Sequence, residues 1–253
     1  MLRAINREAN LFFLALGYFS RIPMPGWVNY TAENLNHASR YFTLVGWLLG
    51  CMVVAVFYVS SHFFSEVISI WLCMFVSLLL TGAFHEDGLA DTADGLGGAF
   101  TREKKLTIMK DSRIGTYGAC ALVMALGGKF ILLQESNNLL IAIPIAYALS
   151  RTLACSLLFT MEIVSNPQTE KAKPQAKAQS RLDKFVLLFS CLPIVFLLSA
   201  KVLLFLLIML MFLRCIFQYF FNKQLGGVTG DCLGASQQIT ELCIYLLLIG
   251  LDI

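Results

Sequence analysis

The chain has 253 residues, of which 58% are hydrophobic and 14% are charged, and its mean hydropathy is +0.73. Apolar runs long enough to cross a bilayer recur along the chain, which excludes one large or two small soluble domains. The net charge of +3 is too small to indicate a nucleic-acid partner.

The apolar runs predict an all-α, polytopic integral membrane protein in which residues 1–253 form a single membrane-embedded domain. A helix needs roughly 20 residues to cross the hydrocarbon core, and it satisfies its backbone polar groups within the segment. A run at 9–20 is too short to cross and is expected to form an interfacial or re-entrant helix. About seven runs qualify as spans: 42–60, 63–84, 116–134, 139–161, 185–199, 202–221 and 235–250.

Lysines and arginines indicate which loops face the cytoplasm, where both residue types are in excess. The segments 85–115 and 162–184 each contain five of them, whereas the turn 135–138 between the intervening spans contains none. Both segments are therefore expected to be cytoplasmic. Two predicted spans also separate 162–184 from 222–234, so the loop 222–234 is expected on the same side. The chain is predicted to be a multi-pass protein of the cytoplasmic (inner) membrane, in contact with the lipid bilayer.

The first polar motif, "HEDGLADTADG" at 85–95, places four carboxylates beside apolar spans. Asp87, Asp91 and Asp94 are spaced i, i+4 and i+7, which puts them on one face of a helix. Three like charges repel each other, and a divalent cation with all-oxygen ligands, Mg²⁺ or Mn²⁺, would reverse that effect. His85 is a candidate for a further ligand or a general base. The alternative is a polar loop that caps a helix.

The second motif is "MKDSRIGTYG" at 109–118, directly before a predicted span. Arg113 has the forked geometry that binds phosphate, and a helix N-terminus near Gly115 favours anions. Asp111 is a candidate for a further substrate contact. Asp–Ser before a helix is also ordinary capping chemistry, so this motif alone does not decide between the two.

The third motif is the glycine-rich loop "LGGVTGDCLGA" at 225–235. Gly227, Thr229 and Gly230 are expected to present backbone N–H groups to phosphate, with Asp231 as a metal ligand. The Lys-Ser/Thr ending of a P-loop is missing. A plain glycine turn between two spans explains the loop equally well.

Four charged residues lie within or near the ends of apolar runs, where charge is expensive and often functional. Snorkelling explains Arg214 and Glu241, and for Lys129 snorkelling and function are evenly matched. Arg151 lies centrally in 139–161 and is predicted to contact substrate.

The basic stretch 165–184 has the composition of a linker. Its lysines, including Lys171 and Lys173, indicate anionic headgroups or an anionic substrate, and a solvated cytoplasmic loop is the alternative. Carboxylates, an arginine and a glycine-rich loop without a nucleophilic triad together favour metal-assisted phosphoryl transfer at the membrane surface.

The chain resembles the cobalamin synthase family, the adenosylcobinamide-GDP ribazoletransferases of the late cobalamin pathway. The resemblance covers almost the whole length, from "FFLALGYFSRIPMP" and "SRYFTLVGWLLG" onward, with looser likeness in "LSRTLA" and "KAKP". Its most specific blocks are "TGAFHEDGLADTADG", "IMKDSRIGTYG" and "LGGVTGDCLGA". One departure is Thr43, where the family often has proline, but it lies at a helix entry outside the acidic site.

The resemblance implies a Mg²⁺-dependent reaction. A ribose hydroxyl of α-ribazole, or of its 5′-phosphate, attacks the cobinamide-linked phosphate of adenosylcobinamide-GDP, and GMP leaves. By motif position, Asp87, Asp91 and Asp94 become the metal and diphosphate site, with His85 as the candidate base. The residues inferred to contact substrate or a second metal are Asp111, Arg113 and Asp231. Docking to other late cobalamin-pathway enzymes and a homo-oligomeric state are left open.

Two other functions are compatible with parts of the sequence. The block "DGLAD" is similar to the start of the CDP-alcohol phosphotransferase motif, but Asp91 stands where that family has arginine and the later glycine-to-aspartate spacing is missing. A membrane transporter would place its acids inside the spans, whereas the acidic motif is predicted to lie at one cytoplasmic edge.

Overall fold

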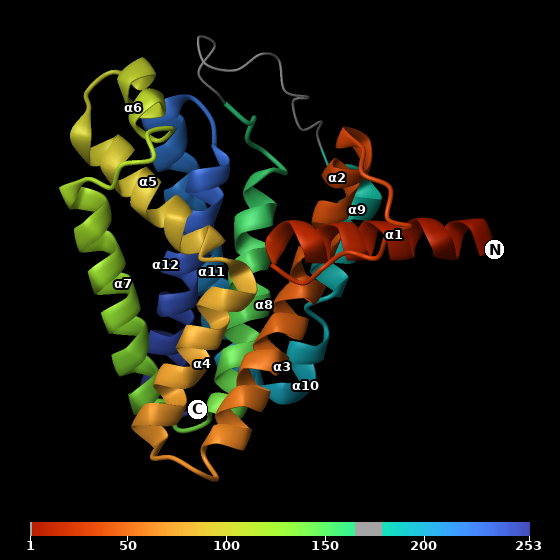
Figure 1. Ribbon diagram of the computed structural model, residues 1–253, viewed down its shortest axis with the longest axis vertical. Helices are drawn as coiled ribbons and strands as arrows, with labels where there is room; N and C mark the ends of the chain where they lie inside the picture. Colours follow the sequence, from red (N-terminus) through yellow and green to blue (C-terminus); the bar gives the residue numbers. More distant parts are fainter. Residues whose placement is uncertain (1, 165–178) are drawn as a thin grey trace.

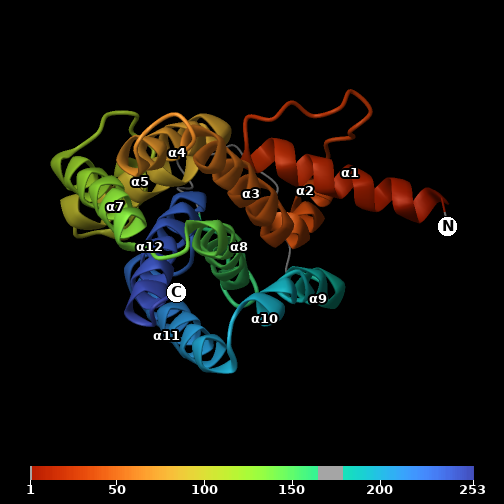
Figure 2. The same ribbon diagram turned by 90° about the horizontal axis from the view of Figure 1, so that it is seen from below.

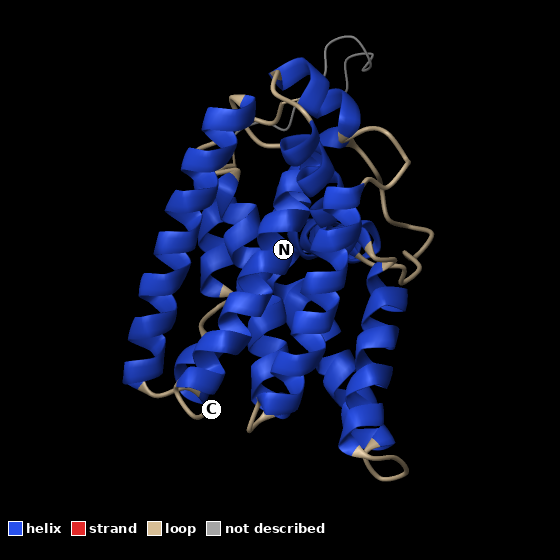
Figure 3. Cartoon of the chain, turned by 90° about the vertical axis from the view of Figure 1, so that its left-hand side faces the viewer, coloured by secondary structure: helices blue, strands red, loops and turns tan. Residues whose placement is uncertain are grey.

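The computed structural model describes residues 2–164 and 179–253. Within these residues every regular element is a helix (Figure 3), and the one strand-like pairing is a bridge between Ile163 and Val228. The predicted all-α class is therefore confirmed. The helices are α1 (Leu2–Phe19), α2 (Ala32–Ala38), the 3₁₀ helix η1 (Ser39–Tyr41), α3 (Phe42–Ser60), α4 (Glu66–Thr81), α5 (Phe84–Gly98), α6 (Arg102–Ile108), α7 (Thr116–Glu135), α8 (Leu139–Leu157), α9 (Arg181–Phe189), α10 (Pro193–Leu197), α11 (Ala200–Leu225) and α12 (Gly230–Gly250).

The long apolar helices are those of a multi-pass membrane protein. Five segments of the described chain are long and apolar enough to cross a membrane: α2–η1–α3 together, α7, α8, α11 and α12. The pair α4 and α5 would make a sixth. The expected count of seven spans therefore reduces to five or six. Helix α1 is not among the candidate spans and lies across the bundle (Figure 1), as expected for the short run at 9–20.

The predicted span 63–84 ends early because the chain bends between α4 and α5. Gly82 and Ala83 both have left-handed backbone conformations, with φ of +63° and +54°. Glycine adopts this region freely, whereas alanine does so only under strain. The two helices meet at 83°. The apolar run therefore continues past a bend that hydropathy alone does not reveal.

The predicted span 185–199 is two short helices, α9 and α10. Their lengths are 9 and 5 residues, and Pro193 is the first residue of α10. Proline has no N–H to donate to the preceding turn, so it begins a helix more readily than it continues one. Figure 1 shows α10 beyond α9 along one side of the bundle, so together they carry the chain toward the start of α11.

Helix α8 is the centre of the bundle (Figure 2), and almost all of its residues are buried. It packs against α3 and α12. A Cβ on Gly46 of α3 would lie 2.5 Å from the backbone oxygen of Tyr147, and a Cβ on Gly50 would lie 2.7 Å from the Cα of Pro144. Small residues four apart let helix backbones approach closely in a membrane protein. The stretch "GWLLG" thus fixes the contact between α3 and α8.

One end of the bundle gathers the polar motifs. It contains α6, the N-terminal ends of α7 and α12, and the loop between α11 and α12 (Figure 1). This end is called the α6 end below. Helix α5 runs obliquely toward it from the bend after α4.

Candidate functional site

Helix α5 carries the acidic motif on a continuous helical backbone. Asp87 is exposed, Asp91 is partly buried and Asp94 is buried. At about 100° per residue, the three side chains fall within an arc of roughly 60° around the helix axis. The structure therefore supports the expectation that they share one face, but it gives them different surroundings.

Asp94 caps the N-terminus of α7. One carboxylate oxygen accepts a hydrogen bond from the N–H of Gly115 at 2.7 Å, and the other accepts one from the N–H of Gly118 at 2.8 Å. A Cβ on either glycine would lie 2.4 Å from an oxygen of Asp94. The helix N-terminus that the sequence predicted for a phosphate thus receives an anion from the protein itself.

Asp231 reaches the acidic face because α5 and α12 are in close contact. A Cβ on Gly88 would lie 2.8 Å from the backbone oxygen of Asp231, and one on Gly234 would lie 3.1 Å from that of His85. Thr229 begins α12 as its N-cap, where its side chain accepts the N–H of Cys232 at 3.1 Å. Close backbone packing therefore places a fourth aspartate beside the motif.

The charges of Asp87, Asp91 and Asp231 act on one another at this contact. Asp231 and Asp87 are the carboxylates that act most strongly on Asp91, and Lys110 partly offsets them. Lys110 Nζ lies 3.1 Å from Asp231 Oδ2. Burial adds to this effect on Asp91, and a cation would relieve the repulsion between the carboxylates.

The donor set fits a hard divalent cation that is completed by a substrate. Among the described residues, no three His, Cys, Asp or Glu side chains converge closely enough to form a complete protein-only metal site. Mg²⁺ usually takes one or two carboxylates together with substrate phosphates and water, not a protein cage. Asp91 with Asp87 or Asp231 meets that requirement, whereas both oxygens of Asp94 are already engaged by α7.

The remaining residues of the second motif lie in the exposed loop before α7. Arg113 Nη2 lies 2.6 Å from Asp111 Oδ2, and the side chain of Arg113 is 87% exposed. Hydrogen bonds from Arg113 lower the pKa of Asp111 to about 2. The guanidinium is thus accessible to an anion, and Asp111 orients it.

The glycine-rich loop divides into two parts. A Cβ on Gly227 would lie 2.6 Å from the backbone oxygen of Glu162, because Val228 pairs with the chain at 162–164 through two backbone hydrogen bonds. Thr229 and Gly230 instead line a cavity, and nothing lies within 4 Å of a Cβ on Gly230. Only the second part of the predicted phosphate loop is open to a ligand.

His85 faces away from the aspartates. At about 100° per residue, Asp87 lies roughly 160° and Asp91 roughly 120° around the axis from it. His85 is 2% exposed and lines the cavity with Thr229 and Gly230. The structure does not bring His85 to the carboxylate face, and its role as a base stays a prediction.

Arg151 lies in the interior of the bundle, not at the α6 end. Its Nη1 donates to the backbone oxygen of Tyr147 at 3.0 Å, and its guanidinium carbon lies 4.7 Å from the centre of the Tyr147 ring. Nearby, Lys129 pairs with Glu241. The snorkelling expected for Glu241 is wrong, because its side chain is buried. Lys171 and Lys173 lie outside the described residues.

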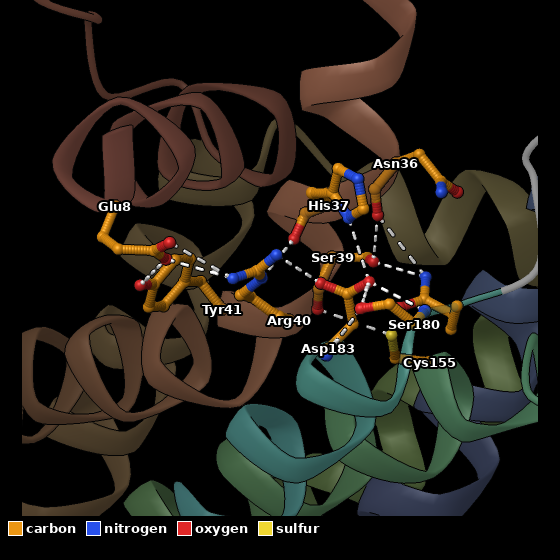
Figure 4. A network of polar contacts seen from close by, with 10 residues as sticks. Glu8, Asn36, His37, Ser39, Arg40, Tyr41, Cys155, Ser180 and Asp183 are labelled. Carbon is orange, nitrogen blue, oxygen red and sulfur yellow. Dashed lines mark hydrogen bonds and ion pairs between the residues drawn. The ribbon is translucent and has the colours of Figure 1, made fainter. Parts of the chain in front are cut away.

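A second polar network lies beside α2 and was not predicted from the sequence (Figure 4). Asp183 of α9 forms an ion pair with Arg40 at 2.6 Å and a hydrogen bond with His37 at 3.0 Å, and Arg40 also pairs with Glu8 of α1 at 3.2 Å. Ser180 and Asp183 form a capping box at the start of α9. The capping pattern is visible in the sequence, whereas the partners from α1 and η1 depend on the fold.

Comparison with known proteins shows the family of this chain. A model of the cobalamin-5-phosphate synthase family matches residues 11–249. A protein of Vibrio parahaemolyticus named adenosylcobinamide-GDP ribazoletransferase is 48% identical over 249 residues, covering 97% of this chain and 94% of that protein. Proteins with the same name from Shewanella piezotolerans (48% identity, 96% of each chain) and Vibrio cholerae (46% identity, 99% of this chain and 97% of that protein) are also similar. No solved structure matches the chain.

Proposed function

The chain belongs to the cobalamin-5-phosphate synthase family and is a transferase of cobalamin biosynthesis, and from this premise we propose that the α6 end catalyses its reaction. The proposed donor is adenosylcobinamide-GDP and the proposed acceptor is α-ribazole or its 5′-phosphate. The products are GMP and adenosylcobalamin or its 5′-phosphate.

The observation that carries this proposal is the crowding of Asp91 by Asp87 and Asp231 where α5 meets α12. A diphosphate is an anion, so it would not approach three carboxylates unless cations accompanied it. Arg113 is exposed in the loop whose Gly115 is held by Asp94, and Lys110 pairs with Asp231. The same end thus contains both carboxylates that would bind a cation and basic side chains that would bind phosphate oxygens.

We assign the cation to Asp91 together with Asp87 or Asp231 and propose that it is Mg²⁺. When bound, Mg²⁺ neutralises charge on the diphosphate and on the departing phosphate oxygen. Asp94 has a different role from the one expected from the sequence, because its two oxygens hold the start of α7. It positions the loop that carries Arg113.

In the proposed step, the ribose hydroxyl oxygen forms a bond to the phosphorus that carries cobinamide. The bond from that phosphorus to the bridging oxygen breaks, and GMP leaves with its electron pair. The hydroxyl proton passes to a carboxylate of the acidic face or to water. Arg113 would hold the donor phosphates, and the carboxylates would hold the cation that neutralises the charge of those phosphates.

The proposal includes a location. The loops at the α6 end carry the lysines and arginines that are typical of cytoplasmic segments. We therefore propose that the protein lies in the cytoplasmic (inner) membrane with this end in the cytoplasm, where nucleotide substrates are found.

The test is GMP release by the purified protein in lipid nanodiscs supplied with adenosylcobinamide-GDP. Reactions with α-ribazole and with its 5′-phosphate are run in parallel, each with Mg²⁺ and with EDTA. We expect GMP release that requires both an acceptor and Mg²⁺. Two results would contradict the proposal. One is release of CMP from a CDP-alcohol in place of GMP release, and the other is movement of substrate across a sealed vesicle without GMP release.

A further inference from the structure

A cavity of about 570 Å³ opens at the α6 end, between α1, α2, α5, α8 and α12. Its volume is in the range of small-molecule sites, roughly 300–1,000 Å³. Neither Asp87 nor Asp91 lines it, so the acidic face lies beside the cavity and not inside it.

Aromatic rings form one continuous wall of this cavity. Phe19 and Phe42 are stacked with centroids 3.9 Å apart, and Phe42 is stacked on the His85 ring at 6.0 Å. Phe84 meets His85 edge to face at 5.4 Å and meets Tyr18 at 6.0 Å. Flat faces of this kind favour a planar aromatic ligand.

His85 supplies a single unsatisfied polar atom to that wall. Its Nε2 is buried without a hydrogen-bond partner, and no other side-chain atom of this kind in the described part of the chain belongs to a residue that lines the cavity. An orphaned buried donor or acceptor costs about 1–3 kcal/mol, so such an atom needs an explanation. A ligand that makes one hydrogen bond would provide it.

Two other polar side chains that line the cavity are engaged by the protein. Gln179 Nε2 donates to Ser39 Oγ at 2.5 Å, and Ser39 Oγ donates to the backbone oxygen of Asn36 at 2.6 Å (Figure 4). The ion pair between Arg40 and Asp183 holds this wall in place. The cavity therefore offers aromatic faces and one buried ring nitrogen without a partner, and Tyr18, Tyr30, Asn36 and Lys110 add further polar groups to its lining.

The cavity also reaches the acidic face at its mouth. Lys110 and Gly230 line it, and Lys110 pairs with Asp231. Partial burial raises the pKa of the Tyr18 phenol, and the neighbouring Tyr30 and Asp231 raise it further. Tyr18 of the aromatic wall is thus electrostatically coupled to a carboxylate of the acidic face.

We propose that this cavity binds the base of the acceptor nucleoside and that His85 Nε2 donates a hydrogen bond to it. The inference rests on the proposed function. A fused bicyclic base of the benzimidazole kind has two apolar faces and one free ring nitrogen that accepts a hydrogen bond, which matches the wall. With the base held there, its ribose extends past Gly230 toward Asp231.

The donor is a poorer occupant. Guanine presents several donors and acceptors along its edges, more than the one unpartnered nitrogen at the aromatic wall can pair. The base role predicted for His85 is also less compatible with this geometry, because His85 lies on the opposite side of α5 from Asp87.

The test is steady-state kinetics in nanodiscs, with KM measured separately for α-ribazole and for the donor. Ala32→Trp fills the cavity from an exposed lining position, and Glu33→Trp is its matched control outside the cavity. His85→Phe keeps the ring but removes the hydrogen bond, and His85→Gln restores a donor. Thermal unfolding of each variant verifies that it is folded.

We expect His85→Phe to raise KM for α-ribazole by roughly tenfold, the value of one lost hydrogen bond. Ala32→Trp should raise the same KM because its side chain occupies the cavity, while KM for the donor stays unchanged in both variants. His85→Gln should recover part of the loss, and Glu33→Trp should match the wild type. Unchanged KM for α-ribazole in folded Ala32→Trp and His85→Phe, or a loss confined to kcat or to donor KM, would overturn the inference. If the wild type released no GMP at all, the proposed function would fail instead. Equilibrium dialysis with labelled α-ribazole alone would then decide the cavity assignment, because Ala32→Trp must still weaken that binding.

Discussion

Lys129 of α7 and Glu241 of α12 form an ion pair inside the bundle, with Nζ and Oε1 2.5 Å apart. Both side chains are buried. Glu241 also accepts hydrogen bonds from Gln237 at 2.7 Å and from Tyr245 at 3.3 Å. A buried carboxylate with this many partners joins two helices, and it does not belong to the acidic face at the α6 end.

Breaking this pair should destabilise the protein more than removing it. Lys129→Met leaves the Glu241 carboxylate without its partner, and Glu241→Gln leaves the Lys129 ammonium without its partner. Each variant should lose about 3–5 kcal/mol of unfolding free energy, because it leaves one buried charge unpaired. The double variant should lose clearly less than the sum of the two. Denaturant unfolding in detergent measures the cycle, and additive losses would contradict a direct interaction.

Asp94→Asn should lower stability before it affects chemistry. An amide can accept only one of the two N–H bonds from Gly115 and Gly118, so the start of α7 loses about 1 kcal/mol of capping. We expect a lower Tm and a rate that falls less than in Asp91→Asn. Equal loss of activity in both variants at an unchanged Tm would instead indicate that Asp94 binds the cation, as proposed for Asp91.

Arg113→Ala should weaken donor binding without unfolding the protein. The guanidinium is largely exposed and contacts Asp111 in the same loop, so its removal breaks no contact with the bundle. The expected change is a rise of several-fold to roughly tenfold in KM for adenosylcobinamide-GDP. Lys104→Ala, an exposed cation on α6, is the control. If KM for the donor is the same in both variants, Arg113 does not bind the phosphates.

The network around Asp183 should make stability depend on acid pH. Burial raises the pKa of Asp183, but hydrogen bonds from Ser180 and His37 and the charge of Arg40 outweigh it and hold the pKa below 3.8. A lowered pKa in the folded state contributes stability that is present above pH 3.8 and is lost as the pH falls further.

The check is the difference in Tm between the wild type and Asp183→Asn as a function of pH. It should narrow as the pH falls below 3.8, because the wild-type carboxylate then also becomes neutral. A difference that stays the same down to pH 3 would show that the charge of Asp183 does not hold α9 against Arg40.

Hydropathy predicted the bounds of the unbroken apolar helices well, and it was less successful where the chain bends. The runs 42–60 and 116–134 nearly coincide with α3 and α7, because an unbroken apolar segment must satisfy its own backbone. The bend at Gly82 leaves the apolar run uninterrupted, so hydropathy cannot detect it. The break at Pro193 was visible as a proline but was outweighed by the surrounding leucines.

The acidic site was predicted as a set of residues but not as an arrangement. Periodicity placed Asp87, Asp91 and Asp94 on one face, and this follows from any straight helix. Which of them is held by α7 depends on how α5 packs, and one sequence does not contain that information. For the same reason the aromatic wall around His85 was not foreseen, since Phe19 and Phe42 meet only in the folded chain.

The most direct test of the account is GMP release by Asp91→Asn and Asp231→Asn, measured in nanodiscs with saturating Mg²⁺, donor and α-ribazole. Asp252→Asn makes the same chemical change at the far end of α12 and is the control. We predict that both variants stay folded and lose roughly a hundredfold or more in rate, because several kcal/mol of charge stabilisation are removed, while Asp252→Asn matches the wild type. Near wild-type GMP release by Asp91→Asn and Asp231→Asn would contradict the account.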